Sequence, residues 1–185
     1  MSEIRLRYSA ESDILPLTQL WQEVFGDPGE LVGAYFRLLW RPEYCLVAEV
    51  DGGLAAMGHC LRGPRAAGLD CAYIYAMATR AGFRGRGLAA AIGRRLIGDA
   101  FGAGADVAAT LPADEGLCGW YQRRLGMSPL FRRGGAGVEF PAAWYEFARL
   151  CGGHSEHSPA RLYALARPGL SAAGLDGLGW ECTFD

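Results

Sequence analysis

Apolar positions repeat with the period of a helix in several segments of the chain. Apolar residues at 14, 17, 20, 21, 24 and 25 form one stripe, which predicts a helix over 13–25 that Gly26 ends. Asp27 and Pro28 then predict an N-cap and a first-turn proline, which open a second helix toward Trp40. Further helices are predicted over 88–101, 114–124, 141–150 and 158–166.

Other segments alternate apolar and polar residues or contain short apolar runs, which is typical of strands. The predicted strands are 3–7, 44–50, 54–61, 71–78, 106–111 and 127–133. The Gly- and Pro-rich segment 62–68 is predicted to be a loop. Trp180–Phe184 alternates again and is predicted to be the final sheet strand, so that residues 141–166 form a helical insertion before it. This order predicts an α+β fold with antiparallel hairpins first and one parallel strand–helix–strand unit later.

The composition is that of one folded domain. The 185 residues are expected to form a single domain, with a core over about 3–133 and the insertion and terminal strand over 134–185. Hydrophobic residues make up 51% and charged residues 21%, which excludes a disordered chain. A net charge of -2 gives no overall field that attracts nucleic acid or anionic lipid, so neither partner is expected. All 18 basic residues are arginine, which excludes Schiff-base and P-loop lysines.

Cysteine usage and the N-terminal residues bear on the compartment. The six cysteines are scattered without a C-x-x-C pair, the first residues are too polar for a secretory signal, and no apolar run approaches the length of a membrane span. A cytoplasmic protein with reduced thiols is therefore expected. His154 and His157 flank Glu156, but two histidines without a third ligand predict no metal site.

The densest chemistry lies where the predicted strand 71–78 meets the helix at 88. Arginines and glycines fill the intervening loop, and Gly85 and Gly87 let backbone amides approach a ligand closely. A helix N-terminus adds unpaired N–H groups and partial positive charge. The loop is thus predicted to bind an anion, and pyrophosphate is the expected ligand.

Two interpretations of this loop compete. Gly85-Arg-Gly87-Leu-Ala-Ala90 fits a loose dinucleotide fingerprint, with Asp106 at the distance of a ribose-binding acid. Asp106, however, begins its predicted strand, whereas such an acid belongs at the C-terminal end of a strand. The dinucleotide interpretation is therefore the weaker one.

Arg84-Gly-Arg-Gly87-Leu-Ala89 also fits Arg-x-x-Gly-x-Ala, and there the sequence resembles the GNAT N-acetyltransferase superfamily. Trp120-Tyr121-Gln-Arg-Arg-Leu-Gly-Met127 is similar to a second signature of that family, and the resemblance covers roughly 3–133. It implies acetyl-CoA as co-substrate. The parallel strands would splay to admit it, and a bulge near Ala76 would aim an amide at the thioester oxygen. The residues that would bind the cofactor are Met77, Ala78 and Thr79 along the pantetheine arm and Arg84, Gly85, Arg86, Gly87, Leu88 and Ala89 at the pyrophosphate.

By the same resemblance, Tyr121 would be the catalytic residue that protonates the leaving CoA thiolate. Tyr121 precedes Gly126 by five residues, where many relatives have four, so a core tyrosine is the alternative. No general base is assigned. Candidates are a water chain or the side chains of Glu49, His59, Asp114 and Glu115.

The resemblance implies an N-acetyltransferase that moves the acetyl group to a primary amine by direct attack in a ternary complex. The acceptor would be a small-molecule amine or a peptide N-terminus, and a homodimer is left open. Aromatic residues of the first two helices are expected in the core, and some could line the acceptor pocket. A non-catalytic acyl-CoA sensor is the rival from another class, since residues 71–79 contain no carboxylate.

Overall fold

The computed structural model describes residues 3–153 and 155–185, and in this part of the chain nine strands form one sheet. The strands are β1 (Ile4–Tyr8), β2 (Cys45–Val50), β3 (Gly53–Ala66), β4 (Leu69–Thr79), β5 (Val107–Thr110), β6 (Ser128–Arg133), β7 (Val138–Glu139), β8 (Arg161–Ala166) and β9 (Gly179–Trp180). The helices are α1 (Ile14–Phe25), α2 (Gly29–Leu38), α3 (Leu88–Gly102), α4 (Glu115–Leu125) and α5 (Ala142–Cys151).

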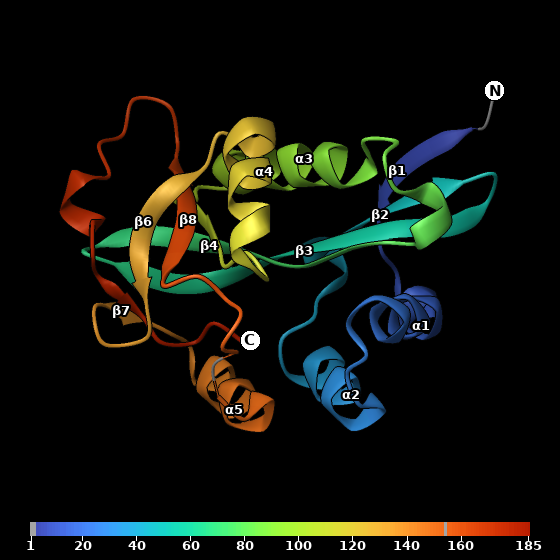
Figure 1. Cartoon of the computed structure of the whole chain (residues 1–185), viewed down its shortest axis with the longest axis horizontal. Coiled ribbons are helices and arrows are strands. Elements are labelled where there is room, and N and C mark those ends of the chain that lie inside the picture. Colours follow the sequence, from blue (N-terminus) through green and yellow to red (C-terminus); the bar gives the residue numbers. More distant parts are fainter. Residues whose placement is uncertain (1–2, 154) are drawn as a thin grey trace.

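The sheet runs in the order β1-β2-β3-β4-β5-β8-β6-β9, with β7 paired to β3. Only β4–β5 and β6–β9 are parallel among the described strand pairs. Helices α3 and α4 cover one face of the sheet, and α1, α2 and α5 cover the other (Figure 1). This is the α+β fold with a mixed, mostly antiparallel sheet that the sequence predicts.

Each face of the sheet has its own core. On one side, aromatic residues of α1, α2 and α5 pack against β4 and the C-terminal segment, with Trp21, Tyr35 and Phe147 almost fully buried. On the other side, α3 packs smaller residues such as Ile92 and Leu96 against the middle of the sheet. The larger aromatic core therefore lies on the α1–α2 side.

Two sequence predictions about β3 and α2 need correction. Residues 62–66 are not a loop: β3 continues to Ala66, and its pairing with β4 shifts between Arg62 and Arg65. Pro64 lies within this irregularity, where a strand tolerates a residue without an N–H donor. Asp27 is not the N-cap of α2, because Pro28 is in that position and the helix begins at Gly29.

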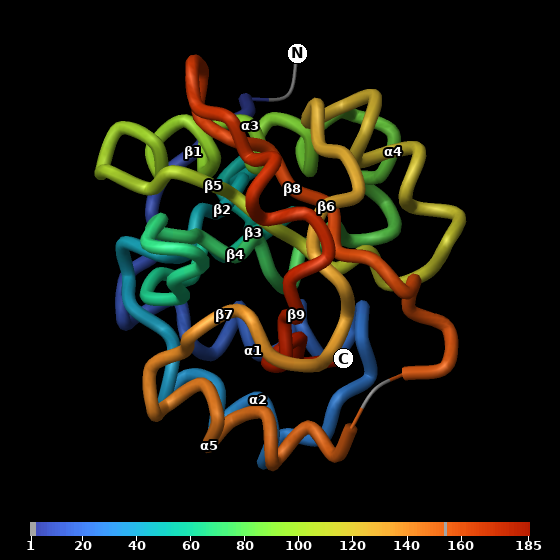
Figure 2. Tube along the Cα trace, turned by 90° about the vertical axis from the view of Figure 1, so that its left-hand side faces the viewer, coloured from blue at the N-terminus to red at the C-terminus, as the bar shows by residue number. Residues whose placement is uncertain are grey.

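The C-terminal part departs most from its prediction. The helix predicted over 141–150 is confirmed as α5, but the helix over 158–166 is wrong, since Arg161–Ala166 is strand β8. β8 pairs antiparallel with both β5 and β6 and lies between them (Figure 2). The terminal strand predicted over Trp180–Phe184 is only β9, Gly179–Trp180, parallel to β6. The side chains of Trp180, Cys182 and Phe184 are nonetheless buried.

Candidate active site

The parallel strands β4 and β5 separate at their C-terminal ends. Their pairing runs from Cys71 with Val107 to Tyr73 with Ala109, while β4 continues to Thr79. Beyond the last pair, the Thr110 hydroxyl donates to the carbonyl oxygen of Ile74 at 2.9 Å. Beyond this point Tyr75, Ala76 and Met77 of β4 and the residues 111–114 after β5 line the same cavity, so a gap separates the two segments, as the expected splay requires.

A β-bulge changes the direction of the backbone of β4 beside this gap. His59 pairs with Tyr75 but Met57 pairs with Ala78, so β4 has one residue more than β3 here. Ala76 is the residue with a left-handed backbone, at φ 46°. Bulges turn backbone groups away from the regular ladder. The bulge predicted near Ala76 is therefore confirmed.

The loop after β4 leads into the N-terminus of α3. Gly85 and Gly87 have φ of 77° and 79°, a region that only glycine enters without strain. A Cβ at either position would meet no atom within 4 Å, so the space in front of the loop is open. Gly87 is the N-cap and its carbonyl accepts from Ala91, which leaves the N–H groups of the first turn pointing out of the helix. These features form an anion-binding terminus.

The arginines around this loop have different partners. Arg80 forms an ion pair with Glu23 and donates to the carbonyl of Leu54, and Arg95 pairs with Asp99. Arg84 donates to the carbonyl of Thr79 at 3.2 Å, and the Arg86 guanidinium lies 5.1 Å from the centre of the Phe83 ring. Arg94, also on α3, donates to the carbonyl of Arg124 at 3.5 Å. Within the loop itself, Arg84 and Arg86 form no ion pair among the described residues, so their positive charge is available to a ligand.

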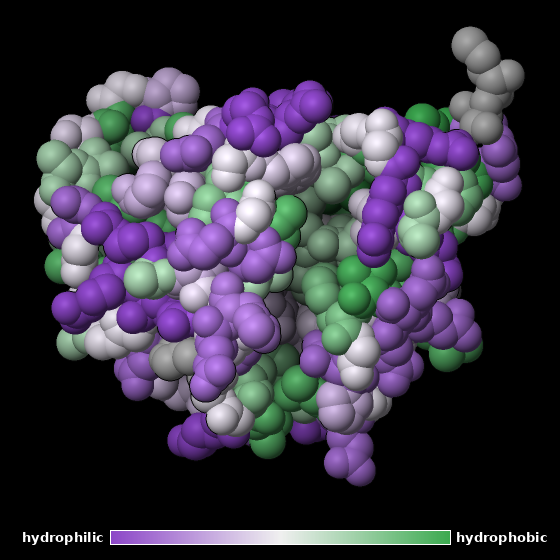
Figure 3. Space-filling view, in the orientation of Figure 1, coloured by the Kyte–Doolittle hydropathy of each residue, from purple (hydrophilic) through white to green (hydrophobic). Residues whose placement is uncertain are grey.

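A cavity of about 820 Å³ joins the strand gap to the α1–α2 side of the sheet. It opens as a hollow near the middle of the face shown in Figure 3. Strand β4, the segment after β5, α1 and the C-terminal residues contribute its walls. Among the lining residues are Trp21, Asp27, Tyr73, Tyr75, Ala76, Met77, Arg84, Thr110, Asp114, Tyr121, Phe184 and Asp185.

A family model described as the Acetyltransferase (GNAT) family matches residues 14–127, a segment that contains the bulge, the glycine loop and Tyr121. The chain belongs to the GNAT acetyltransferase family. No curated protein matches the sequence significantly.

Solved GNAT structures share the fold over the whole chain. The GNAT family N-acetyltransferase YhbS from Escherichia coli, in complex with CoA, aligns with a TM-score of 0.70 at 16% identity and covers 100% of this chain and 93% of its own. A GNAT family acetyltransferase from Brucella melitensis, in complex with acetyl-CoA, aligns with a TM-score of 0.62 at 17% sequence identity, and the alignment covers 99% of each chain. Larger proteins match in part: Eis1 from Mycobacterium abscessus aligns with 0.57 at 18%, covering 69% of this chain and 32% of its own. The chain spans between 32% and 44% of the length of Eis1 and four other such structures.

Tyr121 lies on α4 and lines the same cavity as Ala76 and Arg84. Its side chain is almost entirely buried, and that burial raises the pKa of its phenol, an effect that the nearby Thr110 hydroxyl partly offsets. Gly126 ends α4 with a left-handed backbone, at φ 69°. The five-residue spacing from Tyr121 to Gly126 therefore still brings the ring to the cavity.

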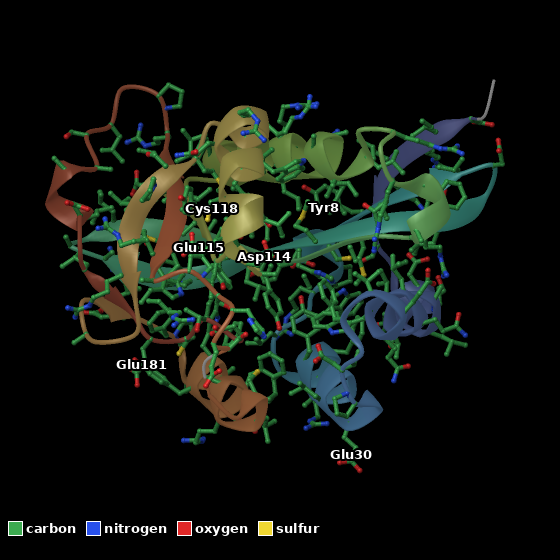
Figure 4. The ribbon with its side chains drawn as sticks, in the orientation of Figure 1. Tyr8, Glu30, Asp114, Glu115, Cys118 and Glu181 are labelled. Atoms are coloured by element: carbon green, nitrogen blue, oxygen red, sulfur yellow. The ribbon has the colours of Figure 1, made fainter. Side chains whose placement is uncertain are left out.

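Of the four candidate bases, Asp114 lines the cavity. It caps α4 by accepting from the Leu117 amide at 3.1 Å and lies at the start of that helix in Figure 4. Glu49 instead binds Arg7, and Glu115 contacts the Cys118 sulfur. His59 is fully buried beneath the bulge, and burial lowers its pKa to about 4. Neither of its ring nitrogens has a hydrogen-bond partner within the described residues.

The C-terminal residues form a wall of the cavity that the sequence did not reveal. The buried Tyr73 hydroxyl donates to the carbonyl of Thr183 at 2.7 Å, and the Tyr75 hydroxyl donates to that of Phe184 at 3.3 Å. Phe184 has φ 62°, which is strained for a bulky residue. Its ring packs against those of Tyr75 and Trp144, with centroids 5.4 and 5.0 Å apart.

The dinucleotide interpretation does not fit this geometry. Asp106 precedes β5, at the end of the strand opposite the glycine loop. Its carboxylate accepts from the Asp70 amide at 3.0 Å and from Arg167 at 2.8 Å, so it joins β4 to the segment after β8. Asp106 is therefore too far from the glycine loop, and too fully engaged with these partners, to bind the ribose of a dinucleotide.

Two searches of the described residues bear on metals and membranes. No group of three or more His, Cys, Asp and Glu side chains among them could hold a metal ion. His154, one of the two histidines for which the sequence predicts no metal site, lies outside the described residues. No helix in the described ranges is long and apolar enough to cross a membrane.

Proposed function

We propose that this GNAT protein is an acetyl-CoA-dependent N-acetyltransferase that acetylates a primary amine by direct attack in a ternary complex. The observation that carries the proposal is the gap between β4 and β5, with the Ala76 bulge at one end and the glycine loop of α3 at the other. Met77, Ala78 and Thr79 would pair with the amide groups of the pantetheine arm as an added strand would. The amides from Arg84 to Ala89 would hold the pyrophosphate.

In the reaction, the amine nitrogen attacks the thioester carbonyl carbon, and the C–S bond breaks as the amide forms. The bulge amide would donate to the carbonyl oxygen as negative charge develops on it. Tyr121 would give its proton to the leaving sulfur. The amine proton would pass to water in the cavity. Asp114 would accept it, because among the four candidate bases named from the sequence it is the one that lines the cavity.

The test is a panel of amines with acetyl-CoA, read by release of free CoA thiol, together with calorimetry of acetyl-CoA binding. Gly87→Asp adds bulk and negative charge at the pyrophosphate site and should abolish binding. Gly87→Asn keeps a residue that tolerates the left-handed backbone and should weaken binding only in part. Gly98→Asp, an exposed position on the same helix, should bind as wild type does. If Gly87→Asp bound acetyl-CoA as tightly as wild type does, the proposed pyrophosphate site at the start of α3 would be wrong.

A non-catalytic acyl-CoA sensor is the second candidate, because β4 places no carboxylate beside the bulge. The carboxylate in this strand, Asp70, lies at its start, away from the bulge. A sensor would bind acetyl-CoA with the same dependence on Gly87 but would release no thiol with any amine.

A further inference from the structure

The part of the cavity on the α1–α2 side is an aromatic pocket. The centroids of the Trp21 and Tyr75 rings lie 5.6 Å apart, and those of the Phe184 and Tyr75 rings lie 5.4 Å apart. All three residues line the cavity, and Tyr75 directly precedes Ala76 of the bulge. An acceptor whose amine reaches the thioester would therefore place the rest of its body against these rings.

One carboxylate in this pocket has no compensating positive charge. Asp27 lies between α1 and α2, half-buried, and its Oδ2 accepts from the Trp21 indole nitrogen at 2.7 Å. Within the described residues it forms no ion pair, and Oδ1 has no hydrogen-bond partner. Asp185 differs, because Arg133 lies 3.5 Å from its carboxylate. The negative charge of Asp27 is therefore available to a ligand.

An organic cation is the ligand that suits this combination. Aromatic faces attract ammonium groups, and a carboxylate beside them adds a charge-assisted hydrogen bond. The indole N–H holds Asp27 in place, so little side-chain freedom is lost when a cation binds. A purely apolar group here would bury the negative charge of Asp27 without a compensating cation, and an anionic group would be repelled by that charge.

We propose that the acceptor amine carries a second positive charge, as a diamine or polyamine does, and that Asp27 binds this distal ammonium among Trp21, Tyr75 and Phe184. This inference rests on the proposed acetyltransferase function, because it assigns the acceptor of that same site. It predicts that the enzyme prefers acceptors with a second positive charge at a fixed distance from the nitrogen that is acetylated.

The test compares α,ω-diamines with the monoalkylamines of the same chain length, from propyl to octyl, by kcat/KM from thiol release. We expect at least one diamine to exceed its monoamine by about tenfold, with an optimum at the length that spans the bulge and Asp27. Asp27→Asn keeps an acceptor for the Trp21 indole and removes the charge, so it should bring the two amines to near equality. Glu30→Gln makes the same change on α2 at a side chain that points away from the molecule, and should keep the preference (Figure 4).

Two results would overturn the inference. Equal use of monoamines and diamines by wild type, or an undiminished preference in Asp27→Asn, would do so while leaving the acetyltransferase proposal intact. If no amine is acetylated although acetyl-CoA binds, calorimetry of the diamines and monoamines on the CoA-saturated protein decides. Diamine binding no tighter than that of the monoamine would then reject the inference, and the absence of transfer would count separately against the proposed function.

Discussion

A phenol ordinarily has a higher pKa than a thiol, and burial raises the pKa of Tyr121 further. Tyr121 is therefore neutral at neutral pH and can donate as thiolate charge develops. We expect Tyr121→Phe to fold normally and to lower kcat by about 10²–10⁴-fold, the range for a lost acid–base group. The dissociation constant of acetyl-CoA, measured by calorimetry, should barely change.

Tyr163→Phe is the matched control, because Tyr163 lies on β8 beside Cys118 and outside the cavity lining. It should keep the wild-type kcat. A Tyr121→Phe variant with an undiminished rate would mean that another group protonates the sulfur.

His59 leads to a prediction about acid stability. Its pKa of about 4 lies below the ordinary value of 6.5, so the unfolded chain binds a proton between these pH values while the folded protein does not. The contribution of His59 to stability is therefore full above pH 6.5 and is lost as the pH drops toward 4, by about 3 kcal/mol at 1.36 kcal/mol per pKa unit. Urea unfolding at several pH values should show this loss in wild type, whereas His59→Phe should keep only the loss near pH 4 that comes from carboxylates with a lowered pKa, such as Asp13 beside Arg7. His157→Phe, at an exposed histidine, should retain the wild-type pH dependence.

At the residue level, the sequence pattern predicted the anion-binding loop and the family resemblance implied the bulge, but neither predicted the cavity wall that the C-terminal residues form. Gly85 and Gly87 were recognisable because glycines before a helix have a local geometric meaning. Asp27 gave a misleading local signal: an acid before a proline suggests an N-cap, and only the folded contact with Trp21 shows its actual partner. The alternation over Trp180–Phe184 predicted a strand but not that Phe184 lines the cavity, because that place depends on the hydroxyls of Tyr73 and Tyr75, more than a hundred residues away.

Among the elements, β8 shows where a sequence pattern is insufficient. Leu162–Ala166 is a short apolar run, and periodicity alone does not separate a buried strand from a buried helix. Ser158 and Pro159 favoured the helix because they suit an N-cap and a first turn. The strand forms because β5 and β6 leave a place between them that accepts one strand antiparallel to both. That place is a property of the whole sheet.

The segment from β9 to the last residue is short but well anchored. Trp180 is fully buried, its ring lies 5.3 Å from Tyr73 and 5.0 Å from Phe131, and its indole donates to the Cys182 carbonyl. We expect Trp180→Ala to lower the free energy of unfolding by about 3–5 kcal/mol, as other large-to-small core changes do. Urea unfolding measures this, with the exposed Glu181→Ala as control. Equal midpoints for the two variants would indicate a terminus that frays.

For the whole molecule, binding of acetyl-CoA should raise the free energy of unfolding. Acetyl-CoA at about 100 times its dissociation constant should add about 2.7 kcal/mol to the free energy of unfolding, because a ligand that binds only the folded state stabilises it. A thermal melt reports this as a rise in Tm. NAD should give no shift, since Asp106 is held by Arg167 at the wrong end of β5. A shift with NAD alone would reverse the assignment of the ligand.

The position of β8 also constrains how the protein is made. On the ribosome, β5, α4 and β6 emerge well before residues 161–166, yet among the described strands it is the later β8 that joins β5 to β6 in the sheet. Until then the nascent chain exposes two unpaired strand edges, which invite pairing with other chains. Completion of the sheet must wait for non-local pairing, a slow class of folding step. Translation arrested before residue 161 would leave a chain that holds Tyr121 and the glycine loop but is prone to aggregate.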